Sequence, residues 1–491
     1  MSYYLIGIGG TGAKCLEAFV HMCGAGLLKD SQPVKMIFVD ADVSCGNLQR
    51  TQKAVEFYNK AKNIGFGDIG IFQNSIDVSE PWTPVPEDCS NLDDVFQRTS
   101  MVNKKEYKPL GLLYDSLFTK QERTTPLDKG FRGHPAIGAA VMSQSMTTNR
   151  IEQWEDIEQA INTDKDARVF IFASVFGGTG AAGFPTIAKI LKDKLKKDEN
   201  GQSIAKIGGA LVLPYFQFPA AQNSEEMQAK VSDFILNTKS ALNYYDKSGL
   251  LGSVFESIYM IGDNDLTLMK EFSLGSNSQK NDAHFIEVYA ALAAFDFFNK
   301  FNKPGTPMIA RGDDSDETLD KIMWEDLPDI SASGHLKDKL GAYTRFLYAY
   351  RNCILRSLKE CESVENAKKN VAWYKELVEK AGKIDVFKDR EVMKSFEALG
   401  DYAEAYFEWW KQIIQGNDKR KVELLNKQLW GSGIWEQNKL DIYQVILPVM
   451  ERKDKLTYQV FWNNLCKYKV TTTNDSGATI LMRAAYELCT K

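Results

Sequence analysis

Two short glycine-rich stretches carry the residues best suited to chemistry in this chain. GIGGTG at residues 7–12 follows an apolar run, and FGGTGAAG at residues 176–183 follows an uncharged run of β-branched and aromatic residues. Each leads into apolar residues at helical spacing. Glycine permits positive φ angles and close backbone approach, so such a turn can aim N–H groups at an anion. Strand, glycine turn and helix N-terminus together predict a phosphate site, although an ordinary strand-to-helix loop can also need glycine.

Two further residues at strand ends or glycine loops suit a nucleotide. Asp40 follows the apolar run 34–39, where a Rossmann fold would use an acid to hold a ribose hydroxyl. Together with GIGGTG it supports a rival interpretation, an NAD or FAD oxidoreductase, although a lone GxGxxG is a weak signal and the spacing to Asp40 is longer than usual. Arg132, in a glycine-bearing loop before a predicted helix, is a natural cation for a phosphate.

The elements that must position these residues alternate between strand and helix over residues 1–300. This order predicts an α/β fold with a doubly wound parallel sheet, followed by a mainly helical C-terminal region. Residues 44–128 are expected to form short helices and loops. The predicted domains are a nucleotide-binding domain at 1–300 with a long apolar helix at 281–299, an acidic connecting loop at 301–334, and a helical domain at 335–491.

Composition narrows the class of protein. The 491 residues are 44% hydrophobic and 25% charged with a formal net charge of -5, which argues against a nucleic-acid-binding face. No apolar run reaches the length of a membrane span. The eight cysteines form no CxxC pair, as in a cytoplasmic protein with reduced thiols, and the four histidines form no HExxH pattern typical of zinc sites.

Six features occur in the order found in the tubulin/FtsZ family of GTPases, and the chain resembles that family over residues 1–300. IGIGGTGAK is similar to the IGVGGGGGN loop of FtsZ-like members, and FGGTGAAG is similar to the family's GGGTGSG or GGGTGTG loop. The other four features are FVDA at 38–41, GHPAIG at 133–138, LPYFQF at 213–218, and Asn281-Asp282 at the start of a long apolar helix.

The resemblance implies a GTP or GDP pocket with Mg²⁺ at the carboxyl ends of the strands. Backbone N–H groups of both glycine loops would hold the phosphates, with Thr179 donating its hydroxyl and Asp40 near the metal. The loop at residues 132–133 would face the terminal phosphate, and aromatic residues and Asn281 would contact the sugar or base. The implied binding residues are Gly9, Gly10, Thr11, Gly12, Asp40, Arg132, Gly133, Gly177, Gly178, Thr179, Gly180, Ala181, Tyr215, Phe218 and Asn281.

The sequence also departs from the family pattern. Phe176 replaces the first glycine of the second loop, and Lys14 and Ala136 replace residues that contact the base and ribose, which leaves guanine and adenine both open. The family's NxDxxD motif, which presents carboxylates to the nucleotide of the next subunit, is not spelled out. Asp313 and Asp326 are the candidate catalytic carboxylates, and a solvated acidic loop is the other interpretation.

The resemblance thus implies a cytoplasmic GTP-binding protein, expected to be a GTPase that self-assembles head to tail. Two alternatives remain open at this stage. One is a nucleotide-binding adaptor that does not hydrolyse and recruits a protein partner through its helical C-terminal region. The other is the Rossmann oxidoreductase, which predicts no role for Thr179.

Overall fold

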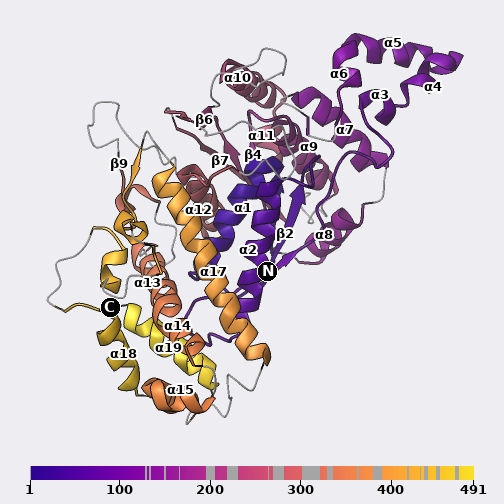
Figure 1. Cartoon of the computed structure of the whole chain (residues 1–491). Helices are drawn as coiled ribbons and strands as arrows, with labels where there is room; N and C mark the ends of the chain where they lie inside the picture. The colour runs from indigo at the N-terminus through magenta and orange to yellow at the C-terminus, as the bar shows by residue number, and fades with distance from the viewer. Residues whose placement is uncertain are drawn as a thin grey trace. The chain divides into compact units, whose positions relative to one another are not determined.

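In the computed structural model the fold is a mixed α/β arrangement (Figure 1). None of the described helices is both long and apolar enough to cross a membrane. The structure describes residues 2–127, 130–131, 134–148, 151–164, 166–194, 205–217, 231–263, 265–268, 281–300, 321–328, 336–361, 364–379, 390–416, 420–431, 433–435, 441–448, 454–469 and 475–490.

The main sheet has six strands in the order β3-β2-β1-β4-β5-β7. The pairs from β2 to β7 run parallel, as the alternation of strands and helices predicted. The chain builds outward from β1 in one direction and from β4 in the other, which is the doubly wound order. Its strands are β1 (Tyr3–Ile8), β2 (Val34–Val39), β3 (Ile76–Val78), β4 (Arg168–Ser174), β5 (Lys206–Val212) and β7 (Ser257–Ile261).

The central strands form because their sequences are apolar on both faces. Every residue of β1 and β4 is buried, as expected for parallel strands covered by helices on both sides. β3 departs from the expectation of short helices and loops over residues 44–128. It has only three residues, too few to show a strand pattern, yet it extends the sheet beside β2.

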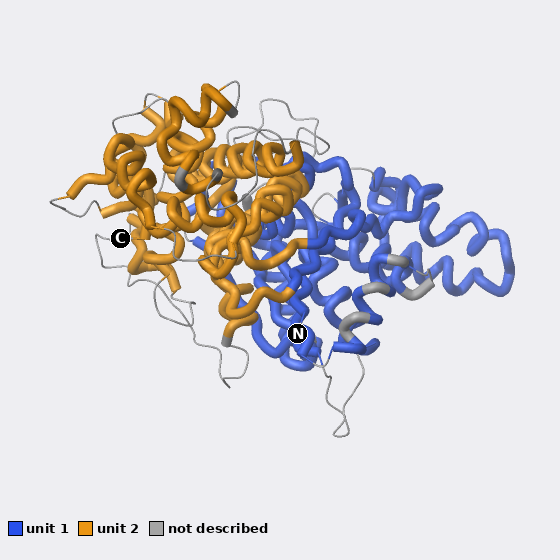
Figure 2. The backbone as a smooth tube through the Cα atoms, turned by 90° about the horizontal axis from the view of Figure 1, so that it is seen from below, with its two compact units in different colours: residues 1–16, 33–51, 77–281 blue, residues 17–32, 52–76, 282–491 orange. Residues whose placement is uncertain are grey.

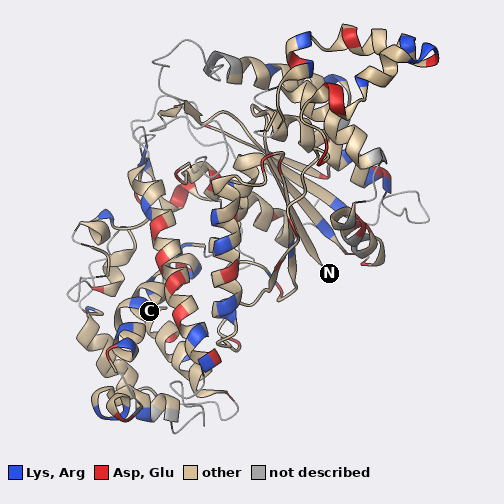
Figure 3. Ribbon diagram, turned by 45° about the vertical axis from the view of Figure 1, so that its right-hand side comes forward, with Lys and Arg blue, Asp and Glu red and all other residues tan. Residues whose placement is uncertain are grey.

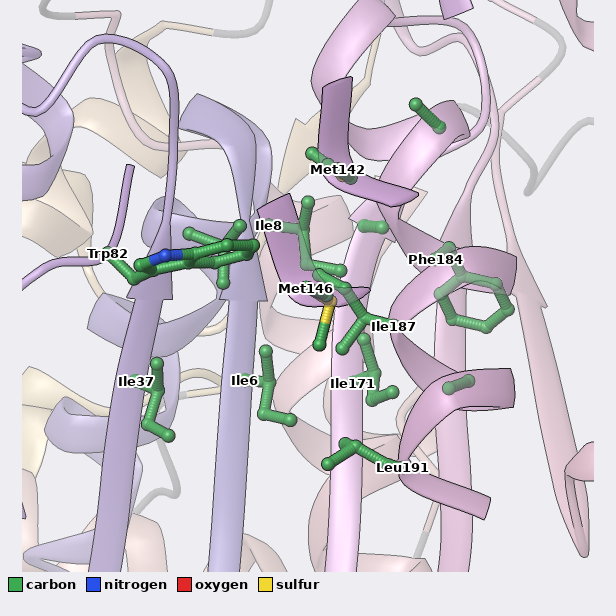
Figure 4. Packing of buried hydrophobic residues seen from close by; sticks show 14 of the residues in the cluster. Ile6, Ile8, Ile37, Trp82, Met142, Met146, Ile171, Phe184, Ile187 and Leu191 are labelled. Carbon is green, nitrogen blue, oxygen red and sulfur yellow. The ribbon is translucent and has the colours of Figure 1, made fainter. Parts of the chain in front are cut away.

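Helices cover the two faces of this sheet. On one face, Figure 4 shows Ile37, Ile6 and Ile171 in a row on neighbouring strands, opposite side chains of α7 and α9. On the other face α1 packs closely, since a Cβ atom on Gly7 would lie 2.5 Å from the Leu16 side chain. The helices concerned are α1 (Gly9–Cys23), α2 (Gly46–Lys62), α7 (Pro135–Thr148), α8 (Glu152–Thr163), α9 (Gly178–Lys194), α10 (Val231–Lys247) and α11 (Leu250–Val254).

A set of short elements lies between β3 and α7. Its helices are α3 (Leu92–Val95), α4 (Arg98–Asn103), η1 (Lys105–Tyr107), α5 (Lys108–Leu117) and α6 (Lys120–Thr124). A two-stranded parallel sheet, β6 (Phe216–Gln217) with β8 (Thr267–Leu268), follows later in the chain.

The later part of the chain is rich in helices. Trp409 and Trp410 of α17 are buried with ring centroids 4.8 Å apart, and Tyr343 of α13 donates a hydrogen bond to Tyr402 of α17. The elements are α12 (Phe285–Lys300), β9 (Lys321–Ile322), η4 (Trp324–Asp326), α13 (Leu336–Ala349), η5 (Tyr350–Leu355), α14 (Arg356–Lys359), α15 (Val364–Asn370), η6 (Tyr374–Glu379), α17 (Arg390–Gln415), β10 (Lys421–Val422), η7 (Lys427–Trp430), η8 (Ile442–Val445), α18 (Tyr458–Cys466) and α19 (Gly477–Cys489).

The chain divides into two compact units, coloured separately in Figure 2. Unit 1 comprises residues 1–16, 33–51 and 77–281, and unit 2 comprises residues 17–32, 52–76 and 282–491. The glycine turns and the strands that lead into them belong to unit 1. The domain boundaries predicted from the sequence, at 300 and 335, stay a prediction.

We expect Ile171→Ala to destabilise unit 1 strongly. Ile171 is fully buried at the centre of β4, so the substitution removes packed methylene groups and leaves a cavity. The free energy of unfolding, measured by urea denaturation, should fall by about 2–5 kcal/mol. The control, Lys247→Ala at an exposed position of α10, should change it by less than about 0.5 kcal/mol. Equal effects of the two substitutions would contradict this assignment of the core.

Candidate functional site

The carboxyl ends of β1 and β4 lie side by side where the strand order reverses. Ile8, the last residue of β1, pairs with Ala173, one residue before β4 ends. β1 leads directly into α1, and β4 leads into α9 after the turn at residues 175–177. Two helix N-termini, each with unpaired backbone N–H groups, therefore begin at the same edge of the sheet. Ligands of open α/β sheets bind at this kind of position.

Thr179 of α9 lies close to the turn at Gly9 and to the loop at Gly130. A Cβ atom on Gly9 would be 3.5 Å from Thr179 Cβ and 3.7 Å from the Gly180 nitrogen. A Cβ atom on Gly130, in the loop before α7, would be 3.9 Å from Thr179 Oγ1. Thr179 is only 9% exposed, and its hydroxyl makes no hydrogen bond within the part of the chain that the structure describes. The structure thus brings together three loops that are far apart in the sequence.

The glycines of the two turns face different surroundings. A Cβ atom on Gly12 would lie 2.8 Å from the Phe172 carbonyl oxygen, and one on Gly180 would lie 2.8 Å from the Ser174 nitrogen. Backbone atoms cannot move aside as a side chain can, so these two positions require glycine for packing alone. Gly10 differs, because its nearest neighbour would be Asn47 Nδ2 at 3.4 Å. Packing among the described residues therefore does not account for glycine at position 10.

Asp40 is held at the end of β2 as a buried acid. Its side chain is 8% exposed, and its Oδ1 accepts a hydrogen bond from the Asp42 backbone nitrogen at 3.3 Å. Burial raises the pKa of its carboxyl group to about 7. Burial first and the Asp40 charge second raise the pKa of the Cys45 thiol to about 11, and Cys45 Sγ lies 3.8 Å from the Cβ position of Gly10. Asp40 and the first turn are therefore near neighbours.

Asn47 and Arg50 of α2 hold the backbone of Asn281, and neither was identified from the sequence. Asn281 donates its backbone N–H to Asn47 Oδ1 at 3.0 Å, and its carbonyl accepts a hydrogen bond from Arg50 Nη1 at 3.0 Å. Since Asn47 also faces Gly10, it links the first turn to Asn281. The sequence did hold one indication of their role. Helix α2 begins soon after the end of β2, so its first residues lie near the same edge of the sheet.

Tyr215 is enclosed beside the second turn. It is 1% exposed, and its hydroxyl accepts a hydrogen bond at 3.3 Å from Lys14 Nζ, itself 2% exposed. Phe176, which stands where the resembling family has glycine, packs against Tyr215, Phe216 and Phe234 with ring centroids 5.1–6.3 Å apart. The departure at position 176 thus anchors an aromatic cluster next to the turn.

Four of the predicted residues lie outside the described residues: Arg132, Gly133, Phe218 and Asp313. Asp326 is described and belongs to unit 2. Its carboxylate accepts a hydrogen bond at 2.7 Å from the Met323 backbone nitrogen, and its carbonyl accepts one from the Tyr289 hydroxyl at 3.0 Å. The Asp326 side chain therefore caps the short helix η4, and its catalytic role stays a prediction.

We expect Asp40→Asn to raise stability at neutral pH. Because the folded protein keeps the Asp40 proton up to about pH 7, while the ordinary value is 3.8, this group lowers the free energy of unfolding as the pH rises through that window. The full effect is about 4 kcal/mol. Between about pH 4 and 7, wild-type protein without nucleotide or Mg²⁺ should lose stability that Asp40→Asn retains. The control, Asp77→Asn, is exposed on β3 and should follow the wild type; an Asp40→Asn curve parallel to wild type would contradict the assignment.

Gly10→Ala and Gly180→Ala should separate binding from folding. Gly180→Ala places a methyl group against the Ser174 backbone and should lower the free energy of unfolding by about 1–3 kcal/mol in urea. Gly10→Ala has room and should fold normally, yet its methyl group would occupy the space that a phosphate needs to approach the backbone. Wild-type binding of a nucleoside triphosphate by Gly10→Ala, measured by calorimetry, would argue against a phosphate at this turn.

Comparison with known proteins assigns no family. No family model matches the chain, and no curated protein matches it. Among solved structures, CetZ2 from Haloferax volcanii, described as a GTPgS-bound protofilament, is similar over 61% of this chain and 59% of that chain. The identity is 14% and the TM-score is 0.30. The matched region therefore spans about three fifths of the CetZ2 chain, and the likeness is too low to place this protein in a family.

Proposed function

We propose that this protein binds a nucleoside triphosphate between the two glycine turns of unit 1. The observation that carries the proposal is the contact of the Gly9 turn with Thr179 at the reversal point of the sheet. Two helix N-termini give two sets of backbone N–H groups, which suits a run of phosphates better than a single one. The Thr179 hydroxyl donates to a phosphate oxygen, and Gly130 leads the loop with Arg132 and Gly133 toward the terminal phosphate.

Asp40 binds Mg²⁺ together with the phosphates in this proposal. Within the described part of the chain, no three His, Cys, Asp or Glu side chains gather to form a metal site of their own. Magnesium commonly uses one or two carboxylates and completes its coordination with phosphate oxygens and water. A cation would also offset the cost of ionising a carboxyl group whose pKa burial has raised to about 7. The donor set therefore fits magnesium bound together with a nucleotide.

The ligand is GTP in this proposal, with adenine nucleotides as the comparison. Asn281 reads the purine edge, held in place by Asn47 and Arg50, and Tyr215 and Phe218 line the sugar or base. The protein assembles head to tail, and Asp313 or Asp326 of one subunit orients the water that attacks the nucleotide of the next. Phosphoryl transfer of this kind depends mostly on positioning and charge.

A non-hydrolysing adaptor is the second candidate. One observation favours it: the Asp326 carboxylate is already engaged in capping η4. The oxidoreductase alternative gives no role to the second glycine turn or to Thr179, although its strand order is similar. Identifying the nucleotide that co-purifies with the protein separates these candidates, because a bound flavin or dinucleotide would overturn the triphosphate proposal.

A mixing experiment should test the shared active site. Thr179→Ala should weaken triphosphate binding by about tenfold by removing one hydrogen bond to a charged group. Asp326→Asn removes the charge but keeps an oxygen that can cap η4. If subunits share the site, GTP hydrolysis should rise more than linearly with protein concentration, and an equimolar mixture of the two variants should hydrolyse faster than either variant alone.

Matched controls sharpen this experiment. Thr186→Ala lies two turns further along α9, where its hydroxyl donates to the Ala182 carbonyl, and it should leave nucleotide affinity unchanged. Glu325→Gln, beside Asp326 and exposed, should leave hydrolysis unchanged. Nucleotide binding without hydrolysis at any protein concentration would favour the adaptor. Unchanged affinity in Thr179→Ala would contradict the proposed pocket.

A further inference from the structure

The segment from α4 to α5 exposes an unusual amount of apolar surface. Figure 1 shows α4 and α5 at the outer end of a projection of unit 1, with α3 and α6 nearer to α7. We call residues 98–117 the arm. Six large apolar side chains of the arm are 46–65% exposed. They are Val102, Tyr107, Leu110, Leu112, Leu113 and Leu117. An apolar cluster of this density on a surface marks an interaction site.

Helix α5 has an apolar face, and several leucines of that face are exposed rather than buried. Leu110, Leu113 and Leu117 recur at the three- and four-residue spacing of one helical face, and this face is turned to solvent. Two polar side chains of α5 are engaged in hydrogen bonds within the protein. The Tyr114 hydroxyl donates to Asp93 at 3.0 Å, and Asp115 accepts hydrogen bonds from Arg98. Of the two charged residues of α5, Asp115 is paired with Arg98 while Lys108 stays exposed, and the exposed leucine face is available to an apolar surface.

The leucine face is broad. An apolar groove of about 660 Å³ runs along Leu110, Leu113 and Leu117 on one side, bounded by Phe96 and Phe118 among others. Leu112, 64% exposed, is not among the residues that line this groove. A protein helix seated in the groove would leave Leu112 in water. A bilayer surface would cover both sides of α5 together.

The charge of the arm complements an anionic bilayer. Lys104, Lys105 and Lys108 are exposed and form no ion pair within the described chain, with Glu106 the one acid among them. In Figure 3 the ribbon at the outer end of the arm is coloured mostly for Lys and Arg, with an acidic position beside them. Lys104 also lies over the Tyr107 ring, with its Nζ 5.7 Å from the centroid. Lysines beside an amphipathic apolar face are typical of helices that lie in the interface of anionic membranes.

We propose that the arm is a peripheral membrane-binding element that recognises anionic phospholipid. The leucines of α5 enter the boundary between headgroups and acyl chains, and Lys104, Lys105 and Lys108 pair with lipid phosphates. Tyr107 lies at headgroup level, where aromatic rings with a polar end are favoured. The nucleotide pocket plays no part in this contact.

Co-flotation of the full chain with vesicles tests the proposal. Without nucleotide, the protein should float with phosphatidylcholine vesicles containing about 30% phosphatidylglycerol, and binding should weaken as salt rises. Leu112→Ser/Leu113→Ser should lower the partition coefficient at least about tenfold. Lys105→Gln/Lys108→Gln should lower it about tenfold on anionic vesicles and leave any binding to pure phosphatidylcholine unchanged.

A charge-matched variant in unit 2 is the control for this experiment. Lys359→Gln/Lys467→Gln changes the net charge equally at exposed positions of unit 2 and should not affect vesicle binding. All substituted residues are exposed, so urea unfolding should match the wild type and exclude misfolding. Failure to bind anionic vesicles, or binding that the arm variants leave intact, would overturn the proposal. Loss of self-association in the leucine variant without any vesicle binding would make the arm a protein interface instead.

Discussion

The parallel pairing of β1 with β4 is the constraint on which the site depends. Ile8 and Ala173 are register partners, so the two strands end at nearly the same level of the sheet. The two turns that follow them are therefore neighbours. Gly12 is a condition of this pairing, because a Cβ atom there would lie 2.8 Å from the Phe172 carbonyl oxygen of β4, and Gly180 is required by its own strand end at Ser174. Helices α1 and α9 follow these turns directly, so their N-termini lie at the same edge of the sheet.

Two electrostatic features of opposite preference lie at that edge of the sheet. The helix N-termini carry partial positive charge and attract an anion. Asp40, by contrast, is a buried acid, and burial raises the pKa of its carboxyl group to about 7; no cation among the described residues is a cause that lowers this pKa. In the function proposed here, a triphosphate with a divalent cation would satisfy both features together. Neither a bare anion nor a bare cation would do so.

The sequence was informative where burial is uniform. β1 and β2 coincide with the apolar runs at residues 3–8 and 34–39, because strands buried on both faces leave an unbroken apolar signal. β3 was missed because three residues carry no period. Asn47 was missed because its role rests on contacts with Gly10 and Asn281, which are remote in sequence. The exposed leucines of α5 have helical spacing, and spacing alone does not say which side of a helix faces water.

The contrast between Gly10 and Gly180 has a consequence for how such sequences diverge. Glycine at position 180 is enforced by the backbone of Ser174, so a descendant that had lost its ligand would still retain it. Glycine at position 10 meets no such backbone contact among the described residues, so it would be free to change in a descendant that did not bind the proposed nucleotide. The two glycines are therefore under different constraints: position 180 is constrained by the packing of the fold, and position 10 by the proposed ligand. Across distant relatives, glycine at position 10 would therefore follow the nucleotide site proposed here, and glycine at position 180 would follow the fold.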